Sequence, residues 1–386
     1  MYRQKRFKEC IKEVKSKLKR APNSLHLLNY HAMACSALKR DNEALLSYQK
    51  IRKLDPKLAG PYYNMGIILK RNGRVEEAIN NYKKAISLKS DYVQAYNNLG
   101  VLYKDKEEYE DAIEMFTKVK ELRPDHQNSH YNLALIKKEQ GLNEEAIELL
   151  LKVLDLNPEH SEAKLNATQT CNEFGIILNS KYEYNKALKY FKAVINLVPS
   201  EYLGYFNMGN TYIELKDFKN AKVYLKKALQ IEPKHEGVYA NLAEVYRNQG
   251  EIKKSLNCYN VAMKINPQNP NNYYNKAILL NDSGQTDKAK ENYQKAIAID
   301  PKHIGSHYNL ALLYEQRGQL KEALNFVKKG QKFDIGNPEL NSAKGVISLK
   351  LGNFKEGWRY NEYRWKVTPH NKVVWPLPGK SLWRGE

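Results

Sequence analysis

The sequence lacks the residues and motifs that most enzymes and membrane proteins display. Its 386 residues include only four cysteines, and none of them is spaced as a CxxC pair or as a metal-ligand set. It has no GxSxG, HExxH or glycine-rich phosphate loop, which argues against the corresponding enzyme classes. No apolar run approaches the 18 residues of a membrane span, and the charged N-terminal segment has no signal-peptide core. We expect no cofactor, no metal, no membrane span and a cytoplasmic location.

Acidic residues are too few to balance the basic ones. The chain carries 63 Lys and Arg against 43 Asp and Glu, a net charge of +20. Such a charge attracts nucleic acid, acidic peptides or lipid head groups. However, the chain is rich in Lys, Asn, Ile and Tyr together, as proteins of AT-biased genomes are, and its lysines spread over outward helix faces. We therefore attribute most of the charge to codon bias and do not expect a nucleic-acid partner.

What the sequence does have is a regular spacing of proline. The intervals between successive repeat prolines are 34 residues or twice that, with one exception of 41. A period of this length predicts stacked repeats, because a single repeat of this size cannot bury its apolar face alone. A chain of this kind works through a long exposed surface rather than a deep catalytic pocket. The prolines are Pro22, Pro56, Pro124, Pro158, Pro199, Pro233, Pro267 and Pro301.

Each repeat contains two blocks with the apolar spacing of an amphipathic helix. With Ala59 counted as slot 1, small residues at slots 8 and 20 (Gly66 and Ala78) predict that the two helices approach closely. Apolar residues hold slots 24 and 27, here Tyr82 and Ala85. Glycine recurs at slot 15, where the first helix must end and the chain turn. The proline at slot 32 blocks continuation of the second helix.

This pattern, as in "YYNMGIILKRNG…EEAINNYKKAI", resembles the tetratricopeptide repeat, a 34-residue helix–turn–helix unit. The match covers about Pro22 to Ile335 in nine consecutive repeats. The resemblance implies an all-α superhelical solenoid of about nine to ten repeats with an irregular C-terminal tail. It also implies a concave groove lined by the first helix of each repeat.

The register of the repeats predicts the domain boundaries. Residues 1–22 fill only second-helix slots and predict a half repeat, 23–335 form the array, 336–365 a degenerate terminal repeat, and 366–386 an extended connector. The repeat that ends at Pro199 has seven extra residues, close to two helical turns. Its first helix, roughly Glu159 to Leu178, is therefore expected to lengthen without rotating its buried stripe.

The C-terminal sequence carries a second resemblance. The ending "NFKEGWRYNEYRW…VVWPLPGKSLWRGE" is similar to the junction at which bacterial tetratricopeptide arrays lead into a glycosyltransferase-like domain. All four tryptophans, Trp358, Trp365, Trp375 and Trp383, lie in this segment. The resemblance implies that the chain is the substrate-recruiting N-terminal arm of a protein glycosyltransferase similar to O-linked N-acetylglucosamine transferases.

In the family, slots 5, 6 and 12 of the first helix are among those that face the groove. An asparagine amide both donates and accepts, so a row at slot 6 suits the backbone of an extended peptide whatever its side chains. This row resembles the asparagine ladder of O-linked N-acetylglucosamine transferases, but asparagine is also common at this slot in the family, and we leave both explanations open. The candidate peptide-binding residues are Asn64, Asn98, Asn132, Asn207, Asn241, Asn275 and Asn309 at slot 6, Tyr63, Tyr131, Tyr274 and Tyr308 at slot 5, and Lys70, Lys104 and Lys138 at slot 12.

Three functions follow from these observations. The first is a protein-interaction scaffold, not itself an enzyme, that binds an extended peptide or protein segment in its groove. The second is the glycosyltransferase arm, and the third is nucleic-acid binding through the basic surface. Chaperone-tail binding is not expected, because no repeat has the Lys at slot 5 and Arg at slot 6 of the carboxylate clamp. Histidines near the repeat prolines, such as His126 and His303, are expected to be loop residues rather than metal ligands.

Overall fold

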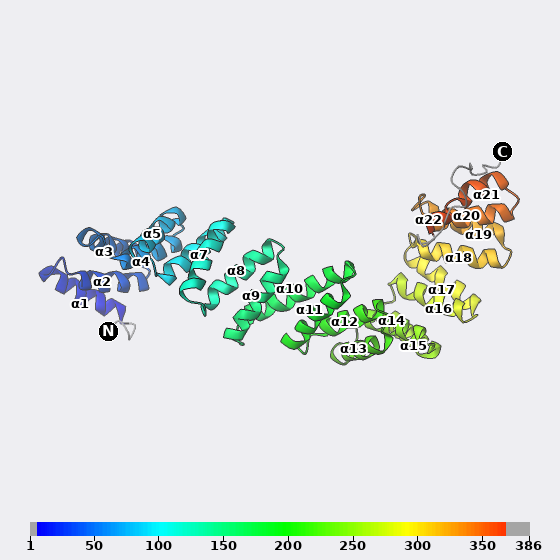
Figure 1. Ribbon diagram of the computed structural model, residues 1–386, viewed down its shortest axis with the longest axis horizontal. Helices are drawn as coiled ribbons and strands as arrows, with labels where there is room; N and C mark the ends of the chain where they lie inside the picture. Colours follow the sequence, from blue (N-terminus) through cyan, green and yellow to red (C-terminus); the bar gives the residue numbers. More distant parts are fainter. Residues whose placement is uncertain (1–5, 368–386) are drawn as a thin grey trace. The chain divides into compact units, whose positions relative to one another are not determined.

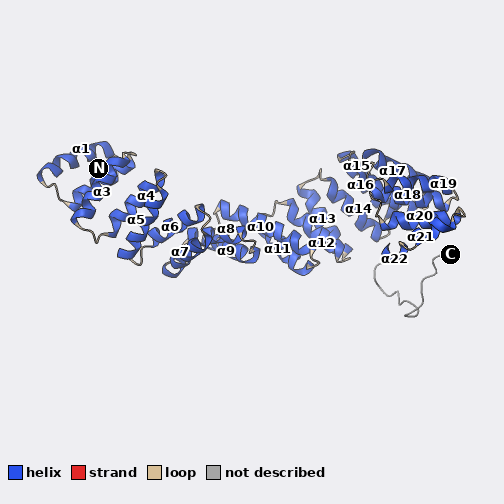
Figure 2. Cartoon of the chain, turned by 90° about the horizontal axis from the view of Figure 1, so that it is seen from above, coloured by secondary structure: helices blue, strands red, loops and turns tan. Residues whose placement is uncertain are grey.

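The protein is all-helical throughout the part that the structure describes. The computed structural model describes residues 6–367, in which every regular element is an α-helix joined to the next by a short turn (Figures 1 and 2). Within each of the two parts of the chain described below, first helices pack against the second helices of their own repeats, as in a tetratricopeptide solenoid. The predicted all-α fold is confirmed.

The chain divides into two compact units, Met1–Gly175 and Ile176–Glu386. The first unit holds a single helix followed by four helix pairs, and α10 runs across the boundary. The helices from the N-terminus to this boundary are α1 (Phe7–Arg20), α2 (Leu25–Ala37), α3 (Asp41–Leu54), α4 (Ala59–Arg71), α5 (Val75–Leu88), α6 (Val93–Asp105), α7 (Tyr109–Leu122), α8 (Gln127–Glu139), α9 (Asn143–Leu156) and α10 (Ser161–Ser180).

The second unit begins with α11 and continues with helix pairs, of which the last has a shorter second helix. Its last described helix is short and ends at Val367. The helices are α11 (Tyr184–Leu197), α12 (Tyr202–Glu214), α13 (Phe218–Ile231), α14 (Glu236–Asn248), α15 (Ile252–Ile265), α16 (Pro270–Asp282), α17 (Thr286–Ile299), α18 (Ile304–Gln316), α19 (Leu320–Gln331), α20 (Pro338–Lys350), α21 (Phe354–Asn361) and α22 (Arg364–Val367).

The ends of the second helices show what the repeat proline contributes. Helix α3 ends at Leu54, two residues before Pro56, as expected if proline stops the helix. Helix α5 ends at Leu88, the same slot, although Ser90 stands where the proline would be. The helix end is therefore set by the packing register of the repeat, and the proline reinforces it.

The turn between the two helices of a repeat uses the left-handed backbone conformation. Gly73 has φ 73° and Gly318 has φ 73°, which glycine adopts without steric cost. The glycines predicted at slot 15 are thereby explained. Glu107 and Lys216 occupy the same slot with φ 62° and 59°, so these two turns hold a side chain in a conformation that costs energy.

Close contact between the paired helices depends on the small residue at slot 8. A Cβ atom built on Gly66 would lie 2.6 Å from Cε1 of Tyr82, and one on Gly100 would lie 2.9 Å from Cε1 of Phe116. Both rings, at slot 24, are fully buried. The predicted close approach is confirmed, and its partner is the slot-24 side chain.

The C-terminal predictions fall largely outside the described residues. Trp358 lies on α21, and Lys366 and Val367 close α22. The rest of the predicted connector, with Trp375 and Trp383, is not among residues 6–367. Among those residues, the helices are too short or too polar to cross a membrane.

Candidate peptide-binding site

All fourteen residues predicted to bind a peptide lie on first helices, and all are partly buried. In α4, the buried stripe comprises slots 3, 4, 7, 8, 10 and 11, from Pro61 to Leu69. Slots 5 and 6, Tyr63 and Asn64, lie beside this stripe, because successive residues turn by about 100° around a helix. The side chains therefore lie between the core and the solvent, where they can contact a neighbouring repeat as well as a ligand.

The structure joins slot 6 of one repeat to slot 5 of the preceding repeat. In the first unit, Asn98 Nδ2 donates a hydrogen bond to the hydroxyl of Tyr63 at 3.4 Å. In the second unit, Asn309 Nδ2 donates to the hydroxyl of Tyr274 at 3.3 Å. Both pairs are 35 residues apart, one repeat plus one position. The asparagines are thus not free side chains, because they link consecutive repeats.

A third pair involves a residue that the sequence analysis missed. Asn166 Nδ2 donates to the hydroxyl of Tyr131 at 3.1 Å. Counting the extended repeat back from Asn207 places Glu173, and not Asn166, at slot 6. Asn166 stands 34 residues after Asn132, so counting from the preceding repeat identifies it. The seven extra residues consequently follow slot 6 within α10.

The identity of the preceding slot-5 residue explains which asparagines form this bond. Asn132 follows a repeat with Asn97 at slot 5, and its amide donates to the carbonyl oxygen of Asn128 in its own helix, at 2.8 Å. Asn241 follows Phe206, which has no hydroxyl, and its amide donates to Oδ1 of Asn210 instead. The predicted ladder is therefore a set of local bonds that depends on where tyrosine occurs.

Two further candidates lack the partner residue that a tyrosine–asparagine pair requires. Tyr308 precedes a repeat with Ala343 at slot 6, and Asn275 follows one with Ala240 at slot 5. Asn64 lies on α4 and Asn207 on α12, where its carbonyl oxygen accepts a bond from the Thr211 hydroxyl at 2.8 Å.

Aromatic rings fix the tyrosines of the pairs. The centroid of the Tyr63 ring is 4.8 Å from that of Tyr92, and the Tyr274 ring is 4.8 Å from His303. Burial raises the pKa of both phenols above the ordinary value. Each phenol therefore stays protonated at neutral pH and keeps one O–H donor after accepting the asparagine bond.

Histidines cap the first helices of several repeats. The ring Nδ1 of His126 accepts a hydrogen bond from the backbone N–H of Ser129 at 3.2 Å, and that of His303 from Ser306 at 3.1 Å. His160 and His235 cap α10 and α14 in the same way. Each of these residues thus precedes a first helix and accepts one of its free backbone N–H groups.

The three lysines at slot 12 lie in the last turns of α4, α6 and α8. A cation there interacts favourably with the helix dipole. Lys138 also lies 3.9 Å from a carboxylate oxygen of Glu173. Helix stabilisation is therefore a sufficient reason for their presence, and a ligand contact remains a proposal.

Comparison with known families agrees with the fold. Residues 125–344 match the model of the cilia and flagella-associated protein 70 C-terminal domain. Residues 68–107 match a model described as TPR repeat, and residues 93–126 match one described as tetratricopeptide repeat. No curated protein matches the chain.

Several solved structures are similar to parts or most of the chain. MamA is 27% identical over 40% of this chain and 91% of its own, with a TM-score of 0.38. YrrB is 27% identical over 50% of this chain and 95% of its own, with a TM-score of 0.35. Yeast Tom70 is 16% identical over 89% of this chain and 92% of its own, with a TM-score of 0.44.

The family model that spans residues 125–344 covers more than half of the sequence, and residues 68–126 before it match tetratricopeptide models. The chain therefore belongs to the family of the cilia and flagella-associated protein 70 C-terminal domain and is a tetratricopeptide-repeat protein.

Proposed function

We propose that this chain is a protein-interaction scaffold that binds an extended segment of its partner along the first-helix face. Tetratricopeptide solenoids present extended binding surfaces of this kind. The observation that carries the finer proposal is the tyrosine–asparagine pair, found at Tyr63–Asn98, Tyr131–Asn166 and Tyr274–Asn309.

Each pair leaves one donor and one acceptor for a ligand. The asparagine donates its N–H to the phenol, which leaves Oδ1 as an acceptor, and the phenol keeps its own O–H as a donor. A peptide backbone offers the complementary N–H and C=O at every residue. Because the pair is held in place before binding, a ligand loses less free energy in ordering these side chains.

This arrangement changes the expected effect of removing the asparagines. Alanine in place of an asparagine that only faced a ligand would leave the fold intact. Asn98 and Asn309 link two repeats, so each substitution is also expected to destabilise the array by about 0.5–1.5 kcal/mol. A binding experiment must therefore separate loss of a ligand contact from loss of a structural bond.

The partner can be captured from the groove itself. A photo-crosslinking residue in place of Asn275, on the first-helix face of α16, should label a protein in cell lysate. The same residue in place of Lys226, exposed on the second helix α13, is the matched control. A protein labelled equally from both positions contradicts binding at the first-helix face.

Calorimetry with the captured partner then tests the pairs. The double variant Asn98→Ala/Asn309→Ala removes the amide acceptors, while Tyr63→Phe/Tyr274→Phe removes the same inter-repeat bonds but keeps the amides. We expect the alanine variant to bind roughly 5- to 160-fold more weakly, for two lost bonds of about 0.5–1.5 kcal/mol each. The phenylalanine variant removes the two phenol donors instead, so it should weaken binding by a similar factor. Equal affinities of both variants and the unmodified chain would reduce the pairs to structural links.

A further inference from the structure

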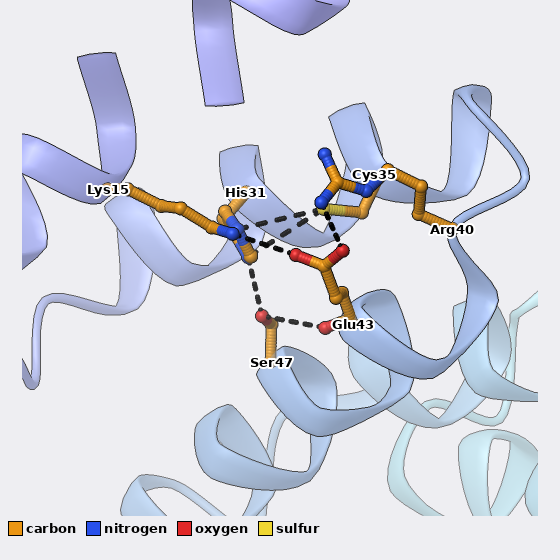
Figure 3. A network of polar contacts seen from close by, with 6 residues as sticks. All are labelled: Lys15, His31, Cys35, Arg40, Glu43 and Ser47. Carbon is orange, nitrogen blue, oxygen red and sulfur yellow. Dashed lines mark hydrogen bonds and ion pairs between the residues drawn. The ribbon is translucent and has the colours of Figure 1, made fainter. Parts of the chain in front are cut away.

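A cluster of polar and sulfur-containing side chains lies inside the first helix pair. His31 and Cys35 on α2 point toward Ser47 and Glu43 on α3 (Figure 3). His31 is 7% exposed and Cys35 is fully buried. Burying such groups costs free energy unless they find partners, so this cluster differs from an ordinary repeat core.

The other repeats show what these slots normally hold. His31 stands at slot 7, where buried Met65, Leu99, Leu133, Met208, Leu242 and Leu310 stand in other repeats. Cys35 stands at slot 11, where the next repeat has buried Leu69. An apolar residue therefore suffices for packing at both positions, and the polar pair in the first repeat calls for a separate explanation.

Hydrogen bonds with Ser47 are compatible with the histidine tautomer that a metal site requires. In the tautomer with the proton on Nδ1, the His31 ring donates to the Ser47 hydroxyl oxygen, 2.8 Å away. The Ser47 hydroxyl then donates its proton to the carbonyl oxygen of Glu43, at 3.1 Å. In this tautomer His31 Nε2 has a free lone pair, the form in which imidazole binds a metal. A second partner that orients the ring in this way accompanies most metal-binding histidines.

The distances fit a tetrahedral metal ion. Cys35 Sγ lies 3.6 Å from His31 Nε2. Two ligands of tetrahedral zinc, at about 2.3 Å for sulfur and 2.0 Å for nitrogen, are roughly 3.5 Å apart. A carboxylate oxygen of Glu43 completes a set of three ligand atoms within 4.8 Å of one another. The Glu43 side chain is 33% exposed, so an ion can reach the set from solvent.

We propose that His31, Cys35 and Glu43 form a zinc-binding site that joins α2 to α3, with a fourth position for water. Cys35 Sγ lies beside the imidazole ring of His31, 4.0 Å from Nδ1. The Cys35 side chain must therefore rotate toward the lone pair of His31 Nε2 when the ion binds. Cys35 binds as the thiolate and releases its proton to solvent. The Glu43 carboxylate forms ion pairs with Lys15 and Arg40, which hold it in place. Another lone pair of the same carboxylate then faces the ion.

An ion bound across α2 and α3 would stabilise the contact between these two helices. A metal ion that binds the folded pair alone adds its binding free energy to the stability of that pair. The sequence predicts no metal site, because the three residues form no recognised spacing until α2 and α3 pack together.

Cobalt(II) titration of the reduced full-length chain tests the site, because thiolate ligation gives a charge-transfer band in the near ultraviolet. We expect one equivalent of Co²⁺ to produce this band and Zn²⁺ to abolish it. Cys35→Ser should eliminate the band, and Ser47→Ala should weaken binding about 10-fold or more. Cys258→Ser, at a buried cysteine of the second unit, is the control and should leave the band unchanged.

His31→Leu separates metal binding from folding, since leucine is the usual residue at slot 7. The variant should remain fully helical by circular dichroism, yet Zn²⁺ should no longer raise its melting temperature as it raises that of the unmodified chain. The proposal is overturned if the unmodified chain gives no thiolate–cobalt band, or if the band survives Cys35→Ser. It is equally overturned if Zn²⁺ stabilises the His31→Leu variant as much as the unmodified chain.

Discussion

Acidification should weaken the helix caps that histidine provides. His126 in the first unit and His303 in the second each accept a backbone N–H through ring Nδ1. A protonated ring has no lone pair there, and its positive charge would stand at a helix N-terminus, where the dipole disfavours cations. Burial is the main cause that lowers the pKa of both imidazoles below the ordinary value of 6.5.

The sign of the effect follows from this direction. Because the pKa of each ring is lower in the folded state, the unfolded chain takes up protons first as the pH falls. The contribution of the two neutral histidine caps to the free energy of unfolding is fully present above about pH 6.5. It is lost as the pH drops toward the pKa values of the two rings in the folded state. The carboxylates of Glu77 and Asp217, whose pKa values are lowered by hydrogen bonds, lose their contribution only below about pH 4.5. The change in the free energy of unfolding between about pH 7.5 and 5.5 therefore reflects the histidines.

Two double variants give the magnitude. Removal of an N-cap costs about 0.5–2 kcal/mol, so His126→Ala/His303→Ala should lose about 1–4 kcal/mol at pH 7.5 if the two sites add. In contrast, His126→Asn/His303→Asn keeps a good cap that does not titrate. We expect it to match the unmodified chain at pH 7.5 and to exceed it at pH 5.5.

Urea denaturation followed by circular dichroism measures these differences. Other buried histidines, such as His307, stay the same in all three proteins and give them a common residual pH dependence. If the asparagine variant loses as much stability between pH 7.5 and 5.5 as the unmodified chain, the caps do not cause the loss and the reasoning is wrong.

Further predictions concern packing, backbone strain and charge. Gly345→Ala should destabilise the α20–α21 pair by about 1–2 kcal/mol in thermal denaturation, because its Cβ would lie 2.7 Å from Cα of Asn361. Gly60→Ala, with nothing within 4 Å, should stabilise by up to about 1 kcal/mol. Glu107→Gly should stabilise by about 0.5–1 kcal/mol by relieving a φ of 62°. RNA or DNA should bind weakly in filter assays and dissociate in moderate salt; tight, sequence-selective binding at physiological salt would contradict this.

Much of the fold could be predicted from the sequence because the repeats share one pattern of apolar residues. The apolar spacing around Gly66 and Tyr82 recurs with a 34-residue period, so one repeat fixes the helix positions in the rest. Slot 15 was identifiable as a turn because glycine supplies the left-handed conformation there. Glu107 and Lys216 show the limit of this signal, since the same backbone forms with unfavourable residues once the packing requires it.

The candidate site could be predicted only in part. Sequence periodicity placed the asparagines on one side of the first helices, but it compares equivalent slots and so treats them as a continuous row. The bonds instead join different slots of neighbouring repeats, as in Tyr63 with Asn98. The cluster of His31, Cys35 and Glu43 could not be predicted from the sequence, because its residues come together only across the contact between α2 and α3.

The extended repeat contains a seven-residue insertion and still forms the hydrogen bond to the preceding repeat. Asn166 lies 34 residues after Asn132 and bonds to Tyr131, so α10 enters in the register of the preceding repeats. Glu173 lies 34 residues before Asn207, in the register of the repeats that follow. Both registers occur in one helix because seven residues are close to two turns, so the buried stripe, which includes Ala167, Cys171 and Leu178, stays on one side. The repeats therefore require the direction of the stripe and the inter-repeat contact to be preserved, while the length of the helix is free to change.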